Sequence, residues 1–184
     1  MRELSLHLLD IAENSIAAQA ATIQISVNEN TQTDRLLMSV RDDGKGMDAE
    51  TVARVVDPFV TSRTTRKVGL GIPLLKEAAE ACNGSLKIES APGKGTLLEV
   101  EFQRSHIDRM PMGNLADTFI TLLVGNPQIH WMFKYRINQD EFIFDDTTLK
   151  RELDGISLSE PFVLNYLNET FETGIHPYQS EPVS

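Results

Sequence analysis

Residues 40–47 read VRDDGKGM, and they follow directly on the apolar run LLMSV of residues 36–40. A short run that is apolar on both faces predicts a buried strand, and an Asp-Gly pair with a further glycine is most often a tight turn. The functional alternative is that Asp42, at the strand end, accepts hydrogen bonds from an exocyclic amine at the mouth of a pocket. Gly44 and Gly46 would then let the backbone approach the ligand and adopt positive φ.

Hydrophobic periodicity on either side of this stretch predicts an α/β protein. Helical spacing runs from residue 2 to about residue 20, and alternation predicts a strand over 22–29 that pairs with 36–40 through a polar turn. A short helix from Asp48, a long helix over 72–84 and two alternating strands over 85–90 and 96–102 follow. The order α-β-β-α-loop-α-β-β segregates helices from antiparallel strand pairs, which favours a two-layer α/β sandwich.

Between the short helix from Asp48 and the long helix over 72–84, the stretch DPFVTSRTTRKVGLG of residues 57–71 shows neither helical nor strand periodicity and is predicted to be a loop. The helix that follows begins at Gly69, Leu70 and Gly71, and its exposed amides and positive dipole end suit a phosphate group. No third glycine completes a dinucleotide fingerprint, and no Walker loop is present. The loop residues Thr61, Ser62 and Arg63 either form a solvated segment or close over a polyphosphate.

The N-terminal helix contains LLDIAENSIAA, residues 8–18, and carries a polar stripe. Glu3, His7, Asp10 and Asn14 follow one another at spacings of four, three and four, which places them on one helix face. Such a stripe is usually a solvated side. The alternative is chemical, because a triphosphate needs a hard divalent cation with oxygen ligands. Asn14 offers a neutral carbonyl oxygen, and Asp10 one turn earlier could hold a magnesium-bound water or orient an attacking one.

The segment after residue 104 differs in charge from the part before it. Residues 1–104 carry 12 cations and 15 acids, a net of -3, whereas residues 105–184 carry 5 and 12, a net of -7. Periodicity predicts a helix over 114–123, a hairpin of 130–137 with 141–145, and helices over 148–153 and 159–171, the last stopped by Gly174. We expect 105–184 to form a small acidic α+β domain that binds a partner or a second copy of the chain.

Composition limits the partners. The 184 residues have a formal net charge of -10, so neither nucleic acid nor an anionic membrane surface is expected to be a general partner. The single cysteine, Cys82, excludes an internal disulfide framework and a multi-cysteine metal site. No apolar run approaches the ~20 residues that cross a bilayer, and the N-terminus has no cleavage pattern. We expect a cytoplasmic protein.

Taken together, LLDIAENSIAA, VRDDGKGM, DPFVTSR, VGLGI and NGSLKIESAPGKGTLLEVEF closely resemble the ATP-binding domain shared by histidine kinases, type II topoisomerases, mismatch-repair ATPases and heat-shock chaperones. The resemblance covers residues 1–104. It implies a Bergerat-type α/β sandwich with ATP and Mg²⁺ between the helices under a mobile lid.

The resemblance also implies roles for individual residues. Asn14 would be the magnesium-ligating asparagine, and Asp42 the adenine-reading aspartate with Gly44 and Gly46 as its glycines. Phe59 would lie in the motif before the lid, and Thr96 would assist adenine recognition through water. The remaining implied nucleotide-binding residues are Met47, Thr61, Ser62, Arg63, Gly69, Leu70 and Gly71.

Two departures from the family pattern bear on activity. Where the hydrolytic members have glutamate as general base, this sequence has Asp10. We also expect no dimerisation helix pair with a phosphoacceptor histidine before the ATP-binding domain. We therefore expect a regulatory protein that transfers the γ-phosphoryl group of ATP to a separate partner, with Arg63 contacting the phosphates. The alternatives are a non-catalytic ATP sensor and a slow ATPase that uses Asp10 as base.

Overall fold

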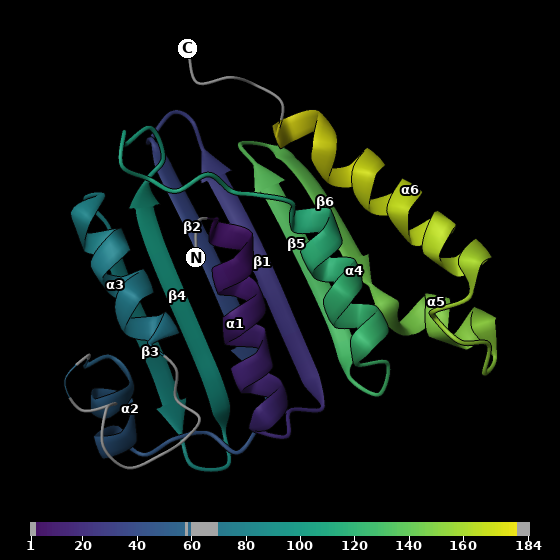
Figure 1. The fold of residues 1–184 in the computed structure, drawn as a ribbon, viewed down its shortest axis with the longest axis horizontal. Coiled ribbons are helices and arrows are strands. Elements are labelled where there is room, and N and C mark those ends of the chain that lie inside the picture. The colour runs from purple at the N-terminus through teal and green to yellow at the C-terminus, as the bar shows by residue number, and fades with distance from the viewer. Residues whose placement is uncertain (1–2, 58, 60–69, 180–184) are drawn as a thin grey trace.

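The computed structural model describes residues 3–57, 59 and 70–179, with side chains described as far as residue 175. Within them the chain builds a six-stranded sheet in the order β3-β4-β2-β1-β5-β6, seen as adjacent arrows in Figure 1. The strands are β1 (Thr22–Asn30), β2 (Arg35–Asp42), β3 (Ser85–Ala91), β4 (Gly95–Gln103), β5 (His130–Ile137) and β6 (Asp140–Asp145). The helices are α1 (Leu4–Ala17), α2 (Ala49–Val55), α3 (Gly71–Ala81), α4 (Leu115–Gly125), α5 (Asp146–Leu153) and α6 (Pro161–Gln179).

Strand alternation decides which face of the sheet is covered. Ile23, Ile25 and Val27 of β1 are buried, whereas the residues between them are only partly covered. Helices α1, α3 and α4 lie over the buried face, and α6 packs beside α4 (Figure 1). All neighbouring strands are antiparallel except β1 and β5, which are parallel. The predicted two-layer α/β sandwich is confirmed.

The expected separation of residues 105–184 into a domain of their own is not what the sheet shows. β5 pairs with β1 from Thr22 and His130 to Glu29 and Ile137, so the sheet continues across the boundary expected near residue 105. The alternation of the two strands explains this pairing. In the register of the pair, the apolar side chains of β5 lie on the same face of the sheet as those of β1, and together they extend one buried layer. The predicted hairpin of β5 with β6 is confirmed.

A buried polar cluster ties this later segment to the earlier one. Glu29 of β1 is 8% exposed, and its two carboxylate oxygens accept hydrogen bonds from Arg104 Nε at 2.7 Å and from the Tyr135 hydroxyl at 2.8 Å. Burial, followed by the negative charge of Glu29, raises the pKa of Tyr135 far above its usual range. The buried carboxylate is thereby satisfied by one group from each side of the expected boundary.

The start of α1 also depends on the later segment. The amides of Leu4 and Ser5 donate to the carbonyls of Pro111 and Met112 at 2.9 and 2.8 Å. First-turn amides have no partner inside a helix, so these carbonyls cap α1 in place of a side chain. At α2 the predicted helix start is confirmed, since Asp48 caps the helix by accepting from the amide of Thr51 at 2.8 Å.

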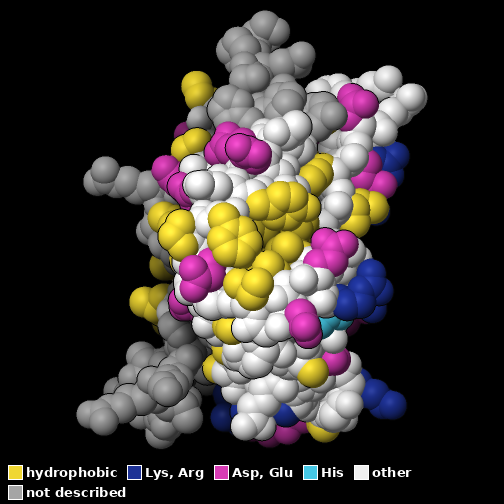
Figure 2. Space-filling view, turned by 90° about the vertical axis from the view of Figure 1, so that its right-hand side faces the viewer, with side chains coloured by type: hydrophobic (Ala, Val, Ile, Leu, Met, Phe, Trp, Pro, Cys, Tyr) yellow, Lys and Arg dark blue, Asp and Glu magenta, His cyan; other side chains and the backbone are white. Residues whose placement is uncertain are grey.

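The last helix is longer than expected. α6 continues past Gly174 to Gln179, so the prediction that this glycine ends the helix is wrong. A Cβ on Gly174 would overlap the ring of Phe142, which shows that the glycine serves close packing against β6. The face of the molecule that carries α5, α6 and β6 combines apolar and acidic side chains (Figure 2). On these elements Ile143, Phe162 and Tyr166 are large apolar side chains with 60%, 59% and 52% exposure.

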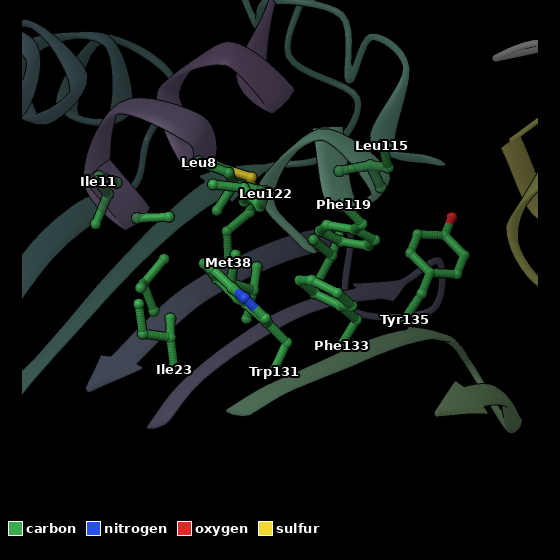
Figure 3. Close-up of a cluster of buried hydrophobic side chains, with 14 of the residues drawn as sticks. Leu8, Ile11, Ile23, Met38, Leu115, Phe119, Leu122, Trp131, Phe133 and Tyr135 are labelled. Atoms are coloured by element: carbon green, nitrogen blue, oxygen red, sulfur yellow. The ribbon is translucent and has the colours of Figure 1, made fainter. Parts of the chain in front are cut away.

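The centre of the core is aromatic. Phe119 of α4 stacks on Phe133 of β5 with centroids 4.4 Å apart, and Trp131 lies 5.7 Å from Phe133 (Figure 3). Trp131 and Phe133 are fully buried and Tyr135 is 1% exposed, so these three aromatic residues of β5 belong to the core. None of the helices in the described part of the chain combines the length and apolarity that a membrane span requires.

Candidate functional site

Asp42 ends β2 on the helix-covered side of the sheet and is only 9% exposed. Its Oδ2 accepts a hydrogen bond from the Ser15 hydroxyl of α1 at 2.6 Å, and its Oδ1 accepts from the Gly44 amide at 2.9 Å. Each carboxylate oxygen can accept more than one hydrogen bond, so these contacts fix the carboxylate and leave it able to accept from a ligand amine. Ser15 was missed by sequence reasoning, because a serine in an apolar helix carries no pattern of its own.

The turn after Asp42 is held against the end of α1 and against β3. Gly46 has φ +68°, as predicted, and a Cβ there would overlap the carbonyl oxygen of Ala91. Gly44 does not adopt a positive φ, which corrects the expectation for this position. Its missing side chain makes room for the end of α1, where the carbonyl oxygen of Ala18 accepts from the Lys45 amide at 3.0 Å.

The second acid of the pair, Asp43, has a structural position. Its Oδ1 accepts from the amides of Ala21 and Thr22 at 2.7 and 2.8 Å, which fixes the start of β1. Partial burial opposes ionisation, but the hydrogen bonds from Thr22 and Ala21 outweigh it and lower the pKa of the Asp43 carboxyl. Asp43 therefore has a structural role, and of the two adjacent acids only Asp42 faces the helix layer.

Thr96 of β4 lies directly opposite Asp42 in the strand register. Its hydroxyl is 2.8 Å from that of Ser90, which also accepts from the Met47 amide at 2.8 Å and contacts the Gly95 carbonyl at 2.9 Å. The predicted residues Asp42, Met47 and Thr96 are thus brought together at one end of the sheet. Ser90, which joins two of them, was not identified from the sequence.

The polar stripe of α1 divides in the structure. Asn14 is exposed and Asp10 is half-buried, but His7 is only 4% exposed and is not part of a solvated side. Burial is the largest cause that lowers the pKa of His7 below its usual value. Asp10 and Asn14 remain one helical turn apart on α1, as the spacing predicted.

Asp10 also meets the beginning of α3. Gly71 is the first residue of that helix, and a Cβ on it would overlap Asp10 Oδ2, so only glycine allows this approach. Leu70 precedes the helix with 55% exposure, and Phe59 is 89% exposed. Thr61, Ser62, Arg63 and Gly69 lie outside the described residues.

A depression of about 570 Å³ borders the same strand ends. Asp42, Ser90 and Thr96 contribute to its walls, and Thr22, Gln24, Arg41, Asp43, Glu89, Ala91, Lys94, Gly95, Leu97 and Met132 complete them. The alternation of β1 and β2 places Gln24 and Arg41 on the face away from the helices. The depression therefore adjoins Asp42 from the open side of the sheet, whereas Asp10 and Asn14 lie on the helix side.

Three chemical functions meet where α1, the end of β2 and the start of α3 come together. Asp42 provides a fixed acceptor for an amine, and the first-turn amides of α3 suit an anion. The amide oxygen of Asn14 and the carboxylate of Asp10 form an oxygen donor set, which fits a hard divalent cation such as Mg²⁺. The arrangement suits a ligand with a polar base at one end and phosphates at the other.

Curated relatives match about half of the chain. The sensor protein kinase FleS of Pseudomonas aeruginosa is 40% identical over 89 residues, which is 48% of this chain and 22% of that protein. Sporulation kinase C of Bacillus subtilis is 29% identical over 98 residues, 53% of this chain and 23% of that protein. The chain thus spans under a quarter of the length of either relative.

A solved structure matches more of the chain. The MutL ATPase domain of Aquifex aeolicus, complexed with ADP, is similar with a TM-score of 0.52 and 15% identity, over 84% of this chain and 68% of that one. Residues 2–106 alone cannot supply 84% of the chain, so the similarity in fold extends into the later segment. The family model described as histidine kinase-, DNA gyrase B-, and HSP90-like ATPase matches residues 2–106, more than half of the chain. The chain belongs to this ATPase family.

Proposed function

We propose that this protein binds ATP with Mg²⁺ between α1, α3 and the end of β2, and transfers the γ-phosphoryl group to a separate protein. The observation that carries the proposal is the fixed carboxylate of Asp42, oriented by Ser15 and Gly44. In this proposal Asp42 accepts from the adenine amine, and Thr96, opposite it in the register, assists through water. The resemblance of the ordered motifs to the family supports these roles.

The phosphate end would lie toward α3. Its first-turn amides would face the phosphates, and Asn14 would supply an oxygen to the cation. Bound Mg²⁺ would neutralise charge that develops on the phosphates. In the proposal Thr61, Ser62, Arg63 and Gly69 complete the phosphate contacts, with Arg63 acting on the γ-phosphate. Catalysis would then consist of positioning and charge neutralisation.

The later segment would provide the contact with the partner protein. Residues 105–184 carry a net charge of -7, and Phe162 and Tyr166 of α6 are exposed on a side of the molecule that combines apolar and acidic side chains (Figure 2). Exposed aromatic and aliphatic side chains ringed by charge are typical of protein-binding surfaces. We propose this face as the docking surface for a partner protein or a second copy of the chain.

Nucleotide binding is tested with a fluorescent ATP analogue. Asp42→Asn should weaken binding by about 1 to 3 kcal/mol, because it replaces a charge-assisted acceptor with an amide. The matched control is Asp43→Asn at the neighbouring acid, which should bind the analogue like the wild type. Equal affinities of Asp42→Asn and the wild type would remove Asp42 as the adenine reader.

Phosphoryl transfer is tested with γ-labelled ATP and proteins captured from the native cell by the full chain. Label should reach a captured protein with the wild type, and Asn14→Ala should reduce transfer by removing the proposed cation ligand. Tight ATP binding with no labelled protein would favour the sensor, in which ATP changes only what the protein binds. A capture repeated with and without Mg-ATP would then show nucleotide-dependent partners without label.

ATP hydrolysis is the second candidate, and the position of Asp10 favours it. The Asp10 carboxylate meets Gly71 at the start of α3, where the proposed phosphates end, so it could orient an attacking water. Phosphate release by the wild type should fall to background in Asp10→Asn and stay unchanged in Glu13→Gln, an exposed acid of the same helix. Equal rates in the wild type and Asp10→Asn would exclude Asp10 as the base.

A further inference from the structure

Three potential metal ligands meet where β5, β6 and α5 come together. His130 is the first residue of β5, Asp145 the last of β6, and Asp146 the first of α5. His130 Nε2 lies 3.1 Å from Asp145 Oδ1 and 3.8 Å from Asp146 Oδ1. All three ligand atoms lie within 4.8 Å of one another, close to the separations that ligands of one ion show.

The Asp146 carboxylate provides the strongest indication of a ligand. Asp146 is 1% exposed, and its Oδ2 forms an ion pair with Lys150 Nζ at 2.5 Å and accepts a hydrogen bond from the Trp131 amide at 3.1 Å. Its Oδ1 is buried and has no hydrogen-bond partner among the residues that the structure describes. A buried carboxylate oxygen without a partner is costly, and this one faces His130 Nε2.

The charges of the cluster favour a dication. Asp145 and Asp146 contribute two negative charges, and Lys150 offsets one of them, which leaves one negative charge with a neutral His130. The side chains of His130 and Asp145 are 38% and 46% exposed, so water can complete the coordination of an ion from one side. An imidazole nitrogen with two carboxylate oxygens is a ligand set of Zn²⁺ and neighbouring transition metals.

We propose that His130, Asp145 and Asp146 form a site for one divalent transition-metal ion of the Zn²⁺ class. The Thr147 amide donates to Asp145 Oδ1 at 2.9 Å and keeps that carboxylate oriented. The Thr147 hydroxyl, 3.1 Å from His130 Nε2, gives up its place to the ion. The site is separate from the proposed nucleotide site and joins the edge strand β6 to β5 and α5.

The competing explanation is a protonated His130 that pairs with both carboxylates without any metal. Two titrations of the full, nucleotide-free chain distinguish the metal site from the protonated histidine. In the first, Co²⁺ is added and its binding is followed by visible d–d absorption. In the second, the protein competes with a chromophoric chelator for Zn²⁺. We expect one ion per chain, with affinity at least about tenfold lower in His130→Gln and in Asp146→Asn. Zn²⁺ should also raise the Tm of the wild type and not that of either variant.

Controls keep the result interpretable. Asp146→Asn loses the partner of Lys150 and is checked for folding by circular dichroism, whereas His130→Gln changes a half-exposed side chain. The matched control is His106→Gln, because His106 Nδ1 has Asp108 Oδ2 at 3.9 Å and resembles the site with one carboxylate. No stoichiometric binding, or equal binding by the wild type and His130→Gln, would overturn the proposal in favour of the protonated histidine.

Discussion

The hydroxyl of Ser15 lies 2.6 Å from Oδ2 of Asp42 and joins α1 to the end of β2. Ser15 follows directly on Asn14, so the proposed cation ligand and the support of the proposed adenine reader are consecutive residues of one helix. A shift of α1 along its axis would move both. This hydrogen bond, together with that of the Lys45 amide to the Ala18 carbonyl, therefore holds the two ends of the proposed nucleotide site in register.

We expect Ser15→Ala to weaken ATP binding less than Asp42→Asn does. The substitution leaves the carboxylate in place but removes one of its two fixed hydrogen bonds, at a cost of about 0.5 to 1.5 kcal/mol, or about two- to tenfold in Kd. Isothermal titration calorimetry with Mg-ATP measures the loss. The matched control is Ser26→Ala, which removes a 2.6 Å contact with Ser39 on the opposite face of the sheet. If both variants bind like the wild type, Ser15 does not orient Asp42.

The contact of Gly71 with Asp10 predicts a change of sign in a double-mutant cycle. In the wild type, Gly71→Ala should destabilise the protein by up to about 1 kcal/mol, because Asp10 must turn its carboxylate away from the new Cβ. In an Asp10→Ala background the same change should be neutral or stabilise by up to about 1 kcal/mol, because alanine favours a helix more than glycine. Urea unfolding measures both. Gly125→Ala, which meets open space at the end of α4, is the control.

Trp131 should behave as a core residue. Trp131→Ala is expected to cost about 3 to 5 kcal/mol of unfolding free energy, since the indole is fully buried and stacks on Phe133. Circular dichroism follows the urea transition, and Ile143→Ala, at a 60% exposed side chain, is the control. A charge at Trp131 should unfold the chain. A folded, soluble species of lower mass would instead indicate that this residue lies in a dimer interface.

His7 should contribute to acid sensitivity. Burial lowers its pKa in the folded state, so the unfolded chain takes up a proton near pH 6.5 while the folded chain does not. The stability contributed by neutral His7 is present above pH 6.5 and is lost as the pH falls through the folded pKa. His7→Gln should therefore lose less stability than the wild type between pH 7.5 and pH 5.5 in urea unfolding. An equal loss of stability in His7→Gln and in the wild type would show that His7 does not contribute.

The sequence predicted much of this architecture because local periodicity determines which segments are helices or strands. The positive φ of Gly46 was also predicted, whereas Gly44, the glycine of the Asp-Gly pair, does not adopt one. The parallel pairing of β5 with β1 was not, because alternation identifies a strand but not its neighbour. Charge asymmetry suggested two domains, yet surface charge does not determine how strands pair.

Within the site, the motif residues were predictable and their supports were not. Asp42 and Thr96 belong to recognisable motifs, whereas Ser15 and Ser90 act only through contacts that close when distant segments fold together. The same holds for Asp10 and Gly71, which lie on different helices and meet through backbone proximity. The spacing of residues in the sequence predicts which side chains are neighbours within one helix or strand, but it does not predict contacts between different elements.

The parallel ladder between β1 and β5 has a consequence for how the protein is made. Residues 22–30 leave the ribosome about a hundred residues before residues 130–137, their partner strand. Until then β1 has one unpaired edge, and the aromatic half of the core is absent. Pairing between strands so far apart in the sequence forms slowly, so the nascent chain exposes an unpaired, aggregation-prone strand edge during synthesis. The step that completes the sheet is therefore the period in which this protein most needs protection from aggregation.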